Sequence, residues 1–194
     1  MGDKNQELFL KKFAGEINGP VLEIGSKDYG NTVDFRSMFP NSRFVGVDLE
    51  TGKGVDAVVD FSTGIGDLVE NQFGLCICCS VMEHCAKPWV MAENMTSVLA
   101  PGGKMFVSVP WVWAYHPYPD DFFRFSYSGI KAIFPQIHWD NCYYSTKQTG
   151  VFYPCDDPTI DSRLAMIIKP KNPKDRPGKF LPSMMVNAIG RKKS

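Results

Sequence analysis

Apolar positions in this chain fall into short runs separated by segments with helical periodicity. Near-continuous apolar runs of strand length lie at 21–24, 44–47, 57–59, 74–79 and 105–109. Such runs suit strands that are covered on both faces, as in a parallel sheet. Helix-compatible segments lie before and between them, at 4–17, 31–39, 64–71 and 88–99. Strands that alternate with helices predict an α/β, Rossmann-like doubly wound fold.

The pattern changes after Pro110, where aromatic and proline residues dominate and predict a long loop over 111–125. Beyond it we expect a helix at 127–134, a strand at 137–146, a possible helix near 159–167 and a last strand at 184–193. No internal repeat is visible. The length of 194 residues suits a single domain. Its expected parts are an N-terminal helix (1–18), a core (19–110) and a less regular C-terminal part (111–194).

Composition excludes several classes of protein. The chain is 44% hydrophobic and 22% charged with a net charge of zero, so no overall field favours nucleic acid or an anionic membrane. Its apolar runs are far shorter than the roughly 20 residues that cross a bilayer. The first residues, MGDKNQELFLKKF, lack the apolar core of a signal peptide. These features predict a cytoplasmic location and no membrane partner.

The six cysteines and three histidines form no recognisable ligand pattern in the sequence. Cys76, Cys78 and Cys79 lie inside an apolar run, and no CxxC pair occurs. We therefore expect buried cysteines in a reduced compartment and no metal site.

Candidate chemistry begins with the segment VLEIGSKDYGN at 21–31, where an apolar run ends in a carboxylate and a glycine-bearing loop. The second apolar run, FVGVD, ends in Asp48. In α/β proteins the backbone after the first strand approaches a nucleotide-like cofactor, and a carboxylate after the second holds its ribose hydroxyls. The two features together predict a cofactor-dependent enzyme.

Three further motifs follow in order: Glu83-His84, the turn Leu99-Ala100-Pro101-Gly102-Gly103, and HPYPDDFFRF at 116–125. With them, the chain resembles the class I S-adenosylmethionine-dependent methyltransferases over about residues 15–135 and, more weakly, in the final strand. The resemblance implies a mostly parallel seven-stranded sheet with an antiparallel last strand and helices on both faces. It also implies S-adenosyl-L-methionine as the cofactor and 19–110 as the cofactor-binding core.

The resemblance assigns a role to each residue at the ends of the early strands. Glu23 would order the amino group of the cofactor, and Asp48 would accept hydrogen bonds from both ribose hydroxyls. Lys27 and Tyr29 stand where the common family loop has glycines, a departure from the family pattern. Asp60 would meet the adenine amino group, although it could instead form a turn. The implied cofactor-binding set is Glu23, Gly25, Ser26, Gly30, Asp48, Leu49, Asp60, Phe61 (through backbone or ring) and Ser80 (beside the sulfonium methyl).

The loop 111–125 leaves the carboxyl end of a strand, where doubly wound sheets place their ligands. His116 is the candidate base, oriented by Asp120 or Asp121, and His84 is a second candidate. Arg124 could anchor substrate or brace the loop, and the Glu83-His84 pair could be structural. The candidate catalytic residues are His116, His84 and Asp120. The candidate acceptor-site residues are Trp111, Tyr115, His116, Asp121 and Arg124.

The predicted activity is methyl transfer to a small-molecule acceptor, such as a hydroxyl of a sugar or other metabolite. The Asn/Asp-Pro-Pro-Tyr/Phe motif of many base and amide methyltransferases is absent, since the chain reads Cys79-Ser80-Val81-Met82 there, which argues against DNA. A homodimer is left open. One alternative is a catalytically silent methyltransferase-fold protein that acts as a binding or regulatory partner. Another is a nicotinamide-dependent oxidoreductase, which should show a full GxGxxG loop.

Overall fold

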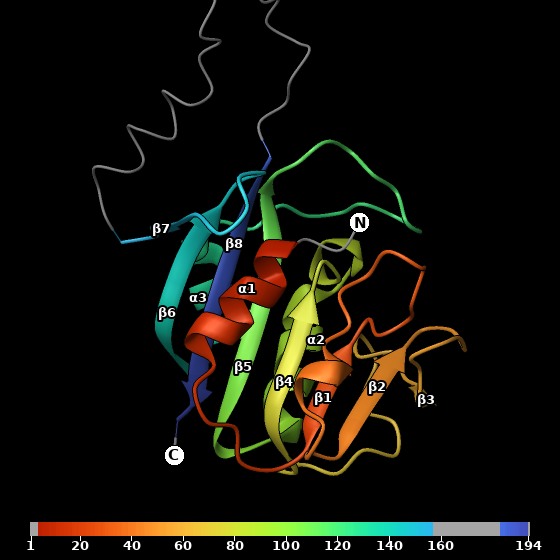
Figure 1. The fold of residues 1–194 in the computed structure, drawn as a ribbon. Coiled ribbons are helices and arrows are strands. Elements are labelled where there is room, and N and C mark those ends of the chain that lie inside the picture. The colour runs from red at the N-terminus through yellow and green to blue at the C-terminus, as the bar shows by residue number, and fades with distance from the viewer. Residues whose placement is uncertain (1–3, 157–182, 194) are drawn as a thin grey trace, which may run out of the picture.

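One eight-stranded sheet organises the computed structural model, which describes residues 4–156 and 183–193 (Figure 1). The strands are β1 (Val21–Ile24), β2 (Phe44–Asp48), β3 (Ala57–Val58), β4 (Phe73–Cys79), β5 (Leu99–Val112), β6 (Ile137–Ser145), β7 (Phe152–Pro154) and β8 (Met184–Lys192). Their order is β3-β2-β1-β4-β5-β8-β6-β7. Strands β1 to β5 pair in parallel, and β8 is antiparallel to both of its neighbours, β5 and β6.

The sheet therefore has the predicted class, mostly parallel with an antiparallel last strand, but it has eight strands instead of seven. The additional strand is β7, a short edge strand that pairs antiparallel with the end of β6. Only three residues pair, and the last is Pro154. A proline is tolerated at a sheet edge because it has no N–H to donate, and so short a run carries little signal in the sequence.

Helices cover both faces of the sheet (Figure 1). Helix α1 (Lys4–Phe13) lies on one face, whereas α2 (Pro88–Val98) and α3 (Tyr127–Ile133) lie on the other. Two short 3-10 helices follow strands, η1 (Arg36–Met38) and η2 (Met82–His84). Among the described helices, none combines the length and apolar character needed to span a bilayer.

Two of the predicted helices are wrong. The segment 31–39 forms only η1, and 64–71 consists of turns. The second segment contains Gly64 and Gly66, and Gly66 has a φ of +58°, a conformation that interrupts a right-handed helix. Helix α1 also ends earlier than predicted, because Gly15 takes a φ of +58°. The predicted helix near 159–167 lies outside the described residues.

The Pro-Gly-Gly turn is built into β5 instead of preceding it. Leu99 pairs with Phe73, and the register resumes with Lys104 opposite Leu75, so the intervening residues bulge from the strand. A side chain at Gly103 would place its Cβ 2.8 Å from the carbonyl oxygen of Phe73. The glycine thus lets the bulge lie close against β4.

Side chains alternate along β5 and separate two apolar layers. Val107 and Val109 face the layer under α2 and α3, whereas Phe106 faces the layer under α1. The α1 layer contains Phe9, Leu10, Val21, Leu75, Ile77, Phe106 and Ile189. Both layers reach the central strands, as expected for a sheet covered on both faces.

A buried polar network lies within the α1 layer. Ser108 donates to Asn187 Oδ1 (2.9 Å), and Asn187 Nδ2 donates to Ser145 Oγ (2.9 Å). Gln6 of α1 donates to Ser108 Oγ (3.3 Å) and to Ser80 Oγ (3.0 Å). Ser108, Ser145 and Asn187 are each 0% exposed. Because buried polar groups are costly without partners, this network fixes α1 in one position over β4, β5, β6 and β8.

Replacement of Asn187 by alanine should therefore destabilise the fold. Asn187→Ala removes three hydrogen bonds, to Ser108, to Ser145 and to the carbonyl of Tyr143, and leaves buried hydroxyls in the α1 layer with one partner fewer. We expect the free energy of unfolding to fall by roughly 2–4 kcal/mol in urea titrations. The exposed Asn31→Ala serves as control and should change it by less than about 0.5 kcal/mol. Equal effects in the two variants would contradict the network.

Candidate functional site

The carboxyl ends of β1, β2, β4 and β5 meet at one edge of the sheet because these strands are parallel (Figure 1). Strand order reverses at β1, which has β2 on one side and β4 on the other. In open α/β sheets, ligands bind outside the carboxyl ends of the strands at such a switch point. Most of the residues predicted for the cofactor lie at this edge.

The loop after β1 packs directly against the turn after β4. Gly25 has a φ of +79° and donates its N–H to the carbonyl of Val47 (2.9 Å). A Cβ on Gly25 would lie 2.2 Å from Cγ2 of Val81. Only glycine satisfies both the conformation and the contact, so this predicted residue is required at least for the close approach of the two loops.

Asp48 joins the ends of β1 and β2. Its carboxylate accepts hydrogen bonds from the backbone N–H of Lys27 (3.1 Å) and of Leu49 (2.8 Å). The Lys27 ammonium is instead drawn to Glu50, at 2.7 Å. Asp48 is half-buried and Leu49 is 58% exposed. A carboxylate offers about four lone-pair positions, so Asp48 can accept further hydrogen bonds.

Two polar groups beside this loop lack partners among the described residues. Burial raises the pKa of Glu23 to about 8, and no hydrogen bond from the described part of the chain reaches its carboxylate. Ser26 is 8% exposed, and its Oγ likewise has no hydrogen-bond partner there. A cationic ligand group beside Glu23 would stabilise the ionised carboxylate.

Further from the strand ends, a salt bridge joins the loop after β1 to the loop after β2. Asp28 binds the Lys53 ammonium (2.6 Å) and also accepts from the N–H of Gly30 (2.7 Å), which has a φ of +87°. Between them, the Tyr29 ring meets the Tyr118 ring edge-on, with centroids 5.4 Å apart. The loop after β1 therefore touches the segment that follows β5.

The residues after β3, Asp60 and Phe61, are held by contacts within the protein. The Asp60 carboxylate accepts from Ser62 N (2.8 Å), which forms the turn that the sequence left open as its alternative role. Phe61 is 2% exposed and its ring packs in the core. The ring therefore has little exposed surface for adenine in this structure, and the contact through backbone or ring stays a prediction. The Phe61 carbonyl also accepts a hydrogen bond from Asn94 Nδ2 (2.9 Å).

Ser80 lies at the end of β4 in the left-handed region, with a φ of +55°. Its N–H donates to the carbonyl of Ser108 (2.8 Å), and its hydroxyl accepts from Gln6 Nε2. Gln6 thus contacts the predicted site, although no sequence motif pointed to it. The available signal was a polar side chain on the apolar face of the first helix, three residues before Phe9.

The segment 113–125 folds back over the turn after β4. Phe122 and Phe123 donate their N–H groups to the carbonyl of Glu83, at 2.8 and 3.2 Å. Phe125 N donates to the carbonyl of Pro110 (2.9 Å), which returns the chain to the end of β5. The predicted loop is confirmed from residue 113 onward, since β5 continues to Val112.

This fold-back brings the two predicted histidines together. The rings of His84 and His116 are nearly perpendicular, with centroids 4.9 Å apart. The Asp121 carboxylate accepts from His116 N (2.8 Å) and lies 3.3 Å from His116 Nδ1. Asp120 instead offers its backbone carbonyl to His84 Nδ1. Of the two carboxylates that could orient His116, Asp121 is the one in contact.

Arg124 braces the segment. Its guanidinium makes a two-pronged contact with Asp121 and reaches the carbonyl of Ala114 (3.2 Å). The Asp121 side chain is 1% exposed, and the Arg124 contact holds its pKa well below the ordinary range. Among the other predicted acceptor residues, Trp111 stacks on Tyr144 (4.9 Å), whereas Tyr115 is 73% exposed.

Glu83 is a second deeply buried acid at this edge, with 1% exposure. Burial raises its pKa to about 8, and its Oε2 has no hydrogen-bond partner among the described residues. Burial also lowers the pKa of His84, which favours the neutral imidazole. A neutral imidazole can accept a proton or bind a cation.

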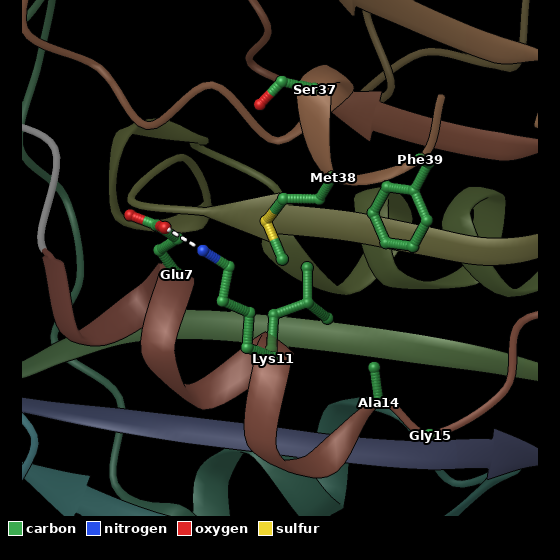
Figure 2. A pocket seen from close by; sticks show the side chains of 8 residues that line it. Glu7, Lys11, Ala14, Gly15, Ser37, Met38 and Phe39 are labelled. Carbon is green, nitrogen blue, oxygen red and sulfur yellow. Dashed lines mark hydrogen bonds and ion pairs between the residues drawn. The ribbon is translucent and has the colours of Figure 1, made fainter. Parts of the chain in front are cut away.

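Two surface hollows lie away from this edge. One, of about 340 Å³, lies between α1 and η1 and includes Glu7, Lys11, Met38 and Phe39 (Figure 2). The other borders the Pro101–Gly103 bulge and Asn18. Neither contains a residue predicted for cofactor or acceptor, so the predicted site rests on the strand-end residues and not on these hollows.

No family model and no curated protein sequence matches this chain. Several solved structures, however, are similar to this chain in fold. A protein of Bacillus halodurans C-125, provisionally assigned as a methyltransferase, has a TM-score of 0.65 at 13% identity, covering 98% of this chain and 99% of its own. The N-methyltransferase NodS of Bradyrhizobium japonicum WM9, solved with S-adenosyl-L-homocysteine, has a TM-score of 0.57 at 12% identity, covering 98% and 86%. The [4+2]-cyclase SpnF has a TM-score of 0.62 at 13% identity, covering 98% and 81%.

The fold is therefore the Rossmann-like fold that these methyltransferase structures share, as the alternation of strands and helices predicted. At these identities the likeness establishes the fold alone. The presence of a cyclase among the similar structures illustrates that one fold supports different chemistries.

The Asp121–Arg124 pair should govern the order of the segment 113–125. Arg124→Met leaves a nearly buried carboxylate without its cation, so we expect a loss of roughly 2–4 kcal/mol in unfolding free energy at pH 7. The lowered Asp121 pKa means that this stabilisation is present above the ordinary carboxyl pKa and is lost on strong acidification. Faster proteolysis within 113–125 should accompany the loss, whereas Asp121→Asn with Arg124→Met should recover part of it. An unchanged cleavage rate in Arg124→Met would contradict the brace.

Proposed function

We propose that this protein transfers a methyl group from S-adenosyl-L-methionine to a hydroxyl of a small-molecule acceptor. The observation that carries the proposal is the convergence, at one sheet edge, of Glu23, Asp48 and Ser80 with the two histidines. Glu23, Asp48 and Ser80 end three adjacent parallel strands at the switch point of the sheet. The histidines lie on the turn and segment that cover this edge.

The strand-end residues fit the chemical groups of the cofactor. The buried Glu23 carboxylate, which has no hydrogen bond from the described residues, suits the ammonium of the methionine moiety. Asp48 can accept from two vicinal hydroxyls on the lone pairs that Lys27 and Leu49 leave available. The bound cofactor supplies an activated methyl group, so the protein chiefly has to position the acceptor and exclude water.

The proton of an acceptor hydroxyl needs a base near neutral pH. His116 Nδ1 lies 3.0 Å from the carbonyl of Ala114 and 3.3 Å from Asp121 Oδ2. Donation of Nδ1–H in that direction leaves Nε2 as the proton acceptor, and Asp121 stabilises the imidazolium that results. His84, whose Nδ1 meets the Asp120 carbonyl, is the second candidate.

A small acceptor is favoured over nucleic acid. The chain has zero net charge, and Cys79-Ser80-Val81-Met82 replaces the motif typical of base and amide methyltransferases. The exposed Tyr115, Tyr118 and Phe122 line the segment that bears His116 and offer apolar surface to a sugar or another metabolite. A catalytically silent protein with this fold is the alternative, and cofactor binding distinguishes the two.

The cofactor site is tested by calorimetric titration with S-adenosylmethionine, S-adenosylhomocysteine and, as a control ligand, NAD. We expect micromolar binding of the first two only. Asp48→Ala should weaken it at least tenfold, because each charge-assisted hydrogen bond contributes roughly 1.5–3 kcal/mol. Glu50→Ala, a neighbouring carboxylate paired with Lys27, is the matched control and should bind within about twofold. No binding of either sulfur compound would instead favour the silent alternative.

Cofactor binding should also release a proton. With a pKa of about 8, Glu23 is mostly protonated at pH 7 in the free protein. An adjacent ammonium lowers that pKa, so the carboxyl ionises on binding and about one proton leaves per cofactor. Calorimetry in buffers of different ionisation enthalpy measures this number. Glu23→Gln should abolish the release, and an equal release by that variant would show that the proton comes from another group.

A further inference from the structure

A second chemical possibility lies at the turn after β4. Glu83, His84 and His116 each present a potential ligand atom, and these atoms lie within 4.8 Å of one another. Glu83 and His84 are adjacent in η2, but His116 comes from the distant segment 113–125. Because the fold-back creates the cluster, the sequence shows no ligand spacing and led to the prediction of no metal site.

The Glu83 carboxylate supplies the second observation. Its side chain is 1% exposed, and its Oε2 has no hydrogen-bond partner among the described residues. A buried polar atom without a partner is costly. The other oxygen, Oε1, lies 4.0 Å from His84 Nε2, so the carboxylate adjoins the histidines, and a cation bound to it would offset that cost.

Both histidines are oriented as metal ligands usually are. Nδ1 of His84 meets the Asp120 carbonyl, and Nδ1 of His116 lies 3.0 Å from the Ala114 carbonyl. Such outer partners keep the proton on Nδ1 and the lone pair on Nε2. His84 Nε2 in turn lies 4.0 Å from Glu83 Oε1.

We propose that Glu83, His84 and His116 bind a divalent first-row transition-metal ion, with Zn²⁺ and Co²⁺ as its simplest probes. Two imidazoles and one carboxylate suit these ions, whereas Mg²⁺ and Ca²⁺ prefer oxygen ligands alone. Metal–ligand bonds of about 2.0–2.2 Å require donors roughly 3.3 Å apart, so each side chain moves inward by about an ångström. His116, 34% exposed and outside any helix or strand, has room to do so, and its exposure gives the ion a path in.

Three protein ligands leave a coordination position for an oxygen from solvent or substrate. Under the proposed function, an acceptor hydroxyl in that position would lose its proton more readily. The metal would then replace His116 as the activating group, since one lone pair cannot bind an ion and accept a proton together. This consequence rests on the proposed function, whereas binding of the ion does not.

The test uses the full chain without an affinity tag, freed of metal by a chelator. Co²⁺ is added and followed by its visible absorption, and Zn²⁺ then displaces it in calorimetry. We expect one ion per chain. Glu83→Gln and His116→Asn should each weaken binding at least tenfold, since even outer-shell partners are worth roughly 10–100-fold. His138→Asn removes the remaining histidine, which is 75% exposed, and should leave binding unchanged.

Circular dichroism checks that each variant is folded, and the more exposed His116→Asn decides the question if Glu83→Gln does not fold. The proposal is overturned if the protein binds no Co²⁺, if both variants bind it as tightly as the parent chain, or if His138→Asn loses it. Because no S-adenosylmethionine is present, the result does not depend on whether the protein is a methyltransferase.

Discussion

The turn that follows β4 is the structural element on which the rest of the site depends. Its Glu83 carbonyl accepts two backbone hydrogen bonds, from Phe122 and Phe123, and these fold the segment 113–125 back over the sheet edge. Backbone groups bind there, so the geometry does not require particular side chains at 122 and 123. His116 meets His84 only because of this docking. Two further contacts, of Tyr118 with the Tyr29 ring and of Phe125 N with the Pro110 carbonyl, also hold the segment at the strand ends.

The same turn also contacts the loop after β1, which holds residues predicted to bind the cofactor. Val81 fills the space that a side chain at Gly25 would need, so the loop after β1 lies directly against the turn. Ser80, one residue earlier, is held by Gln6 through the buried network beneath α1. The stretch 80–84 thus contacts the loop after β1, helix α1 and the segment 113–125. A methyl donor and an acceptor brought to this edge would be aligned by one rigid element, as in-line transfer requires.

The sequence predicted the sheet well and the contacts poorly, for physical reasons. Buried strands such as 74–79 can be recognised in the sequence by their unbroken apolar runs. Helix α2 can be recognised by its periodicity and by Pro88 at its start. The helix prediction at 64–71 failed because the backbone conformation at Gly66 overrode the pattern. Contacts between residues far apart in the sequence, such as His84 with His116, cannot be inferred from spacing. They follow from how a loop without regular structure docks, which tertiary packing decides.

The central claim is that this edge of the sheet binds S-adenosylmethionine, and a crystal structure with S-adenosylhomocysteine tests it most directly. The account predicts that the nucleoside lies across the ends of β1 and β2, with both ribose hydroxyls on the Asp48 carboxylate and the amino group beside Glu23. The sulfur should point toward Ser80 and the histidine pair. A nucleoside bound elsewhere on the protein, or crystals that stay free of it at saturating concentration, would contradict the account.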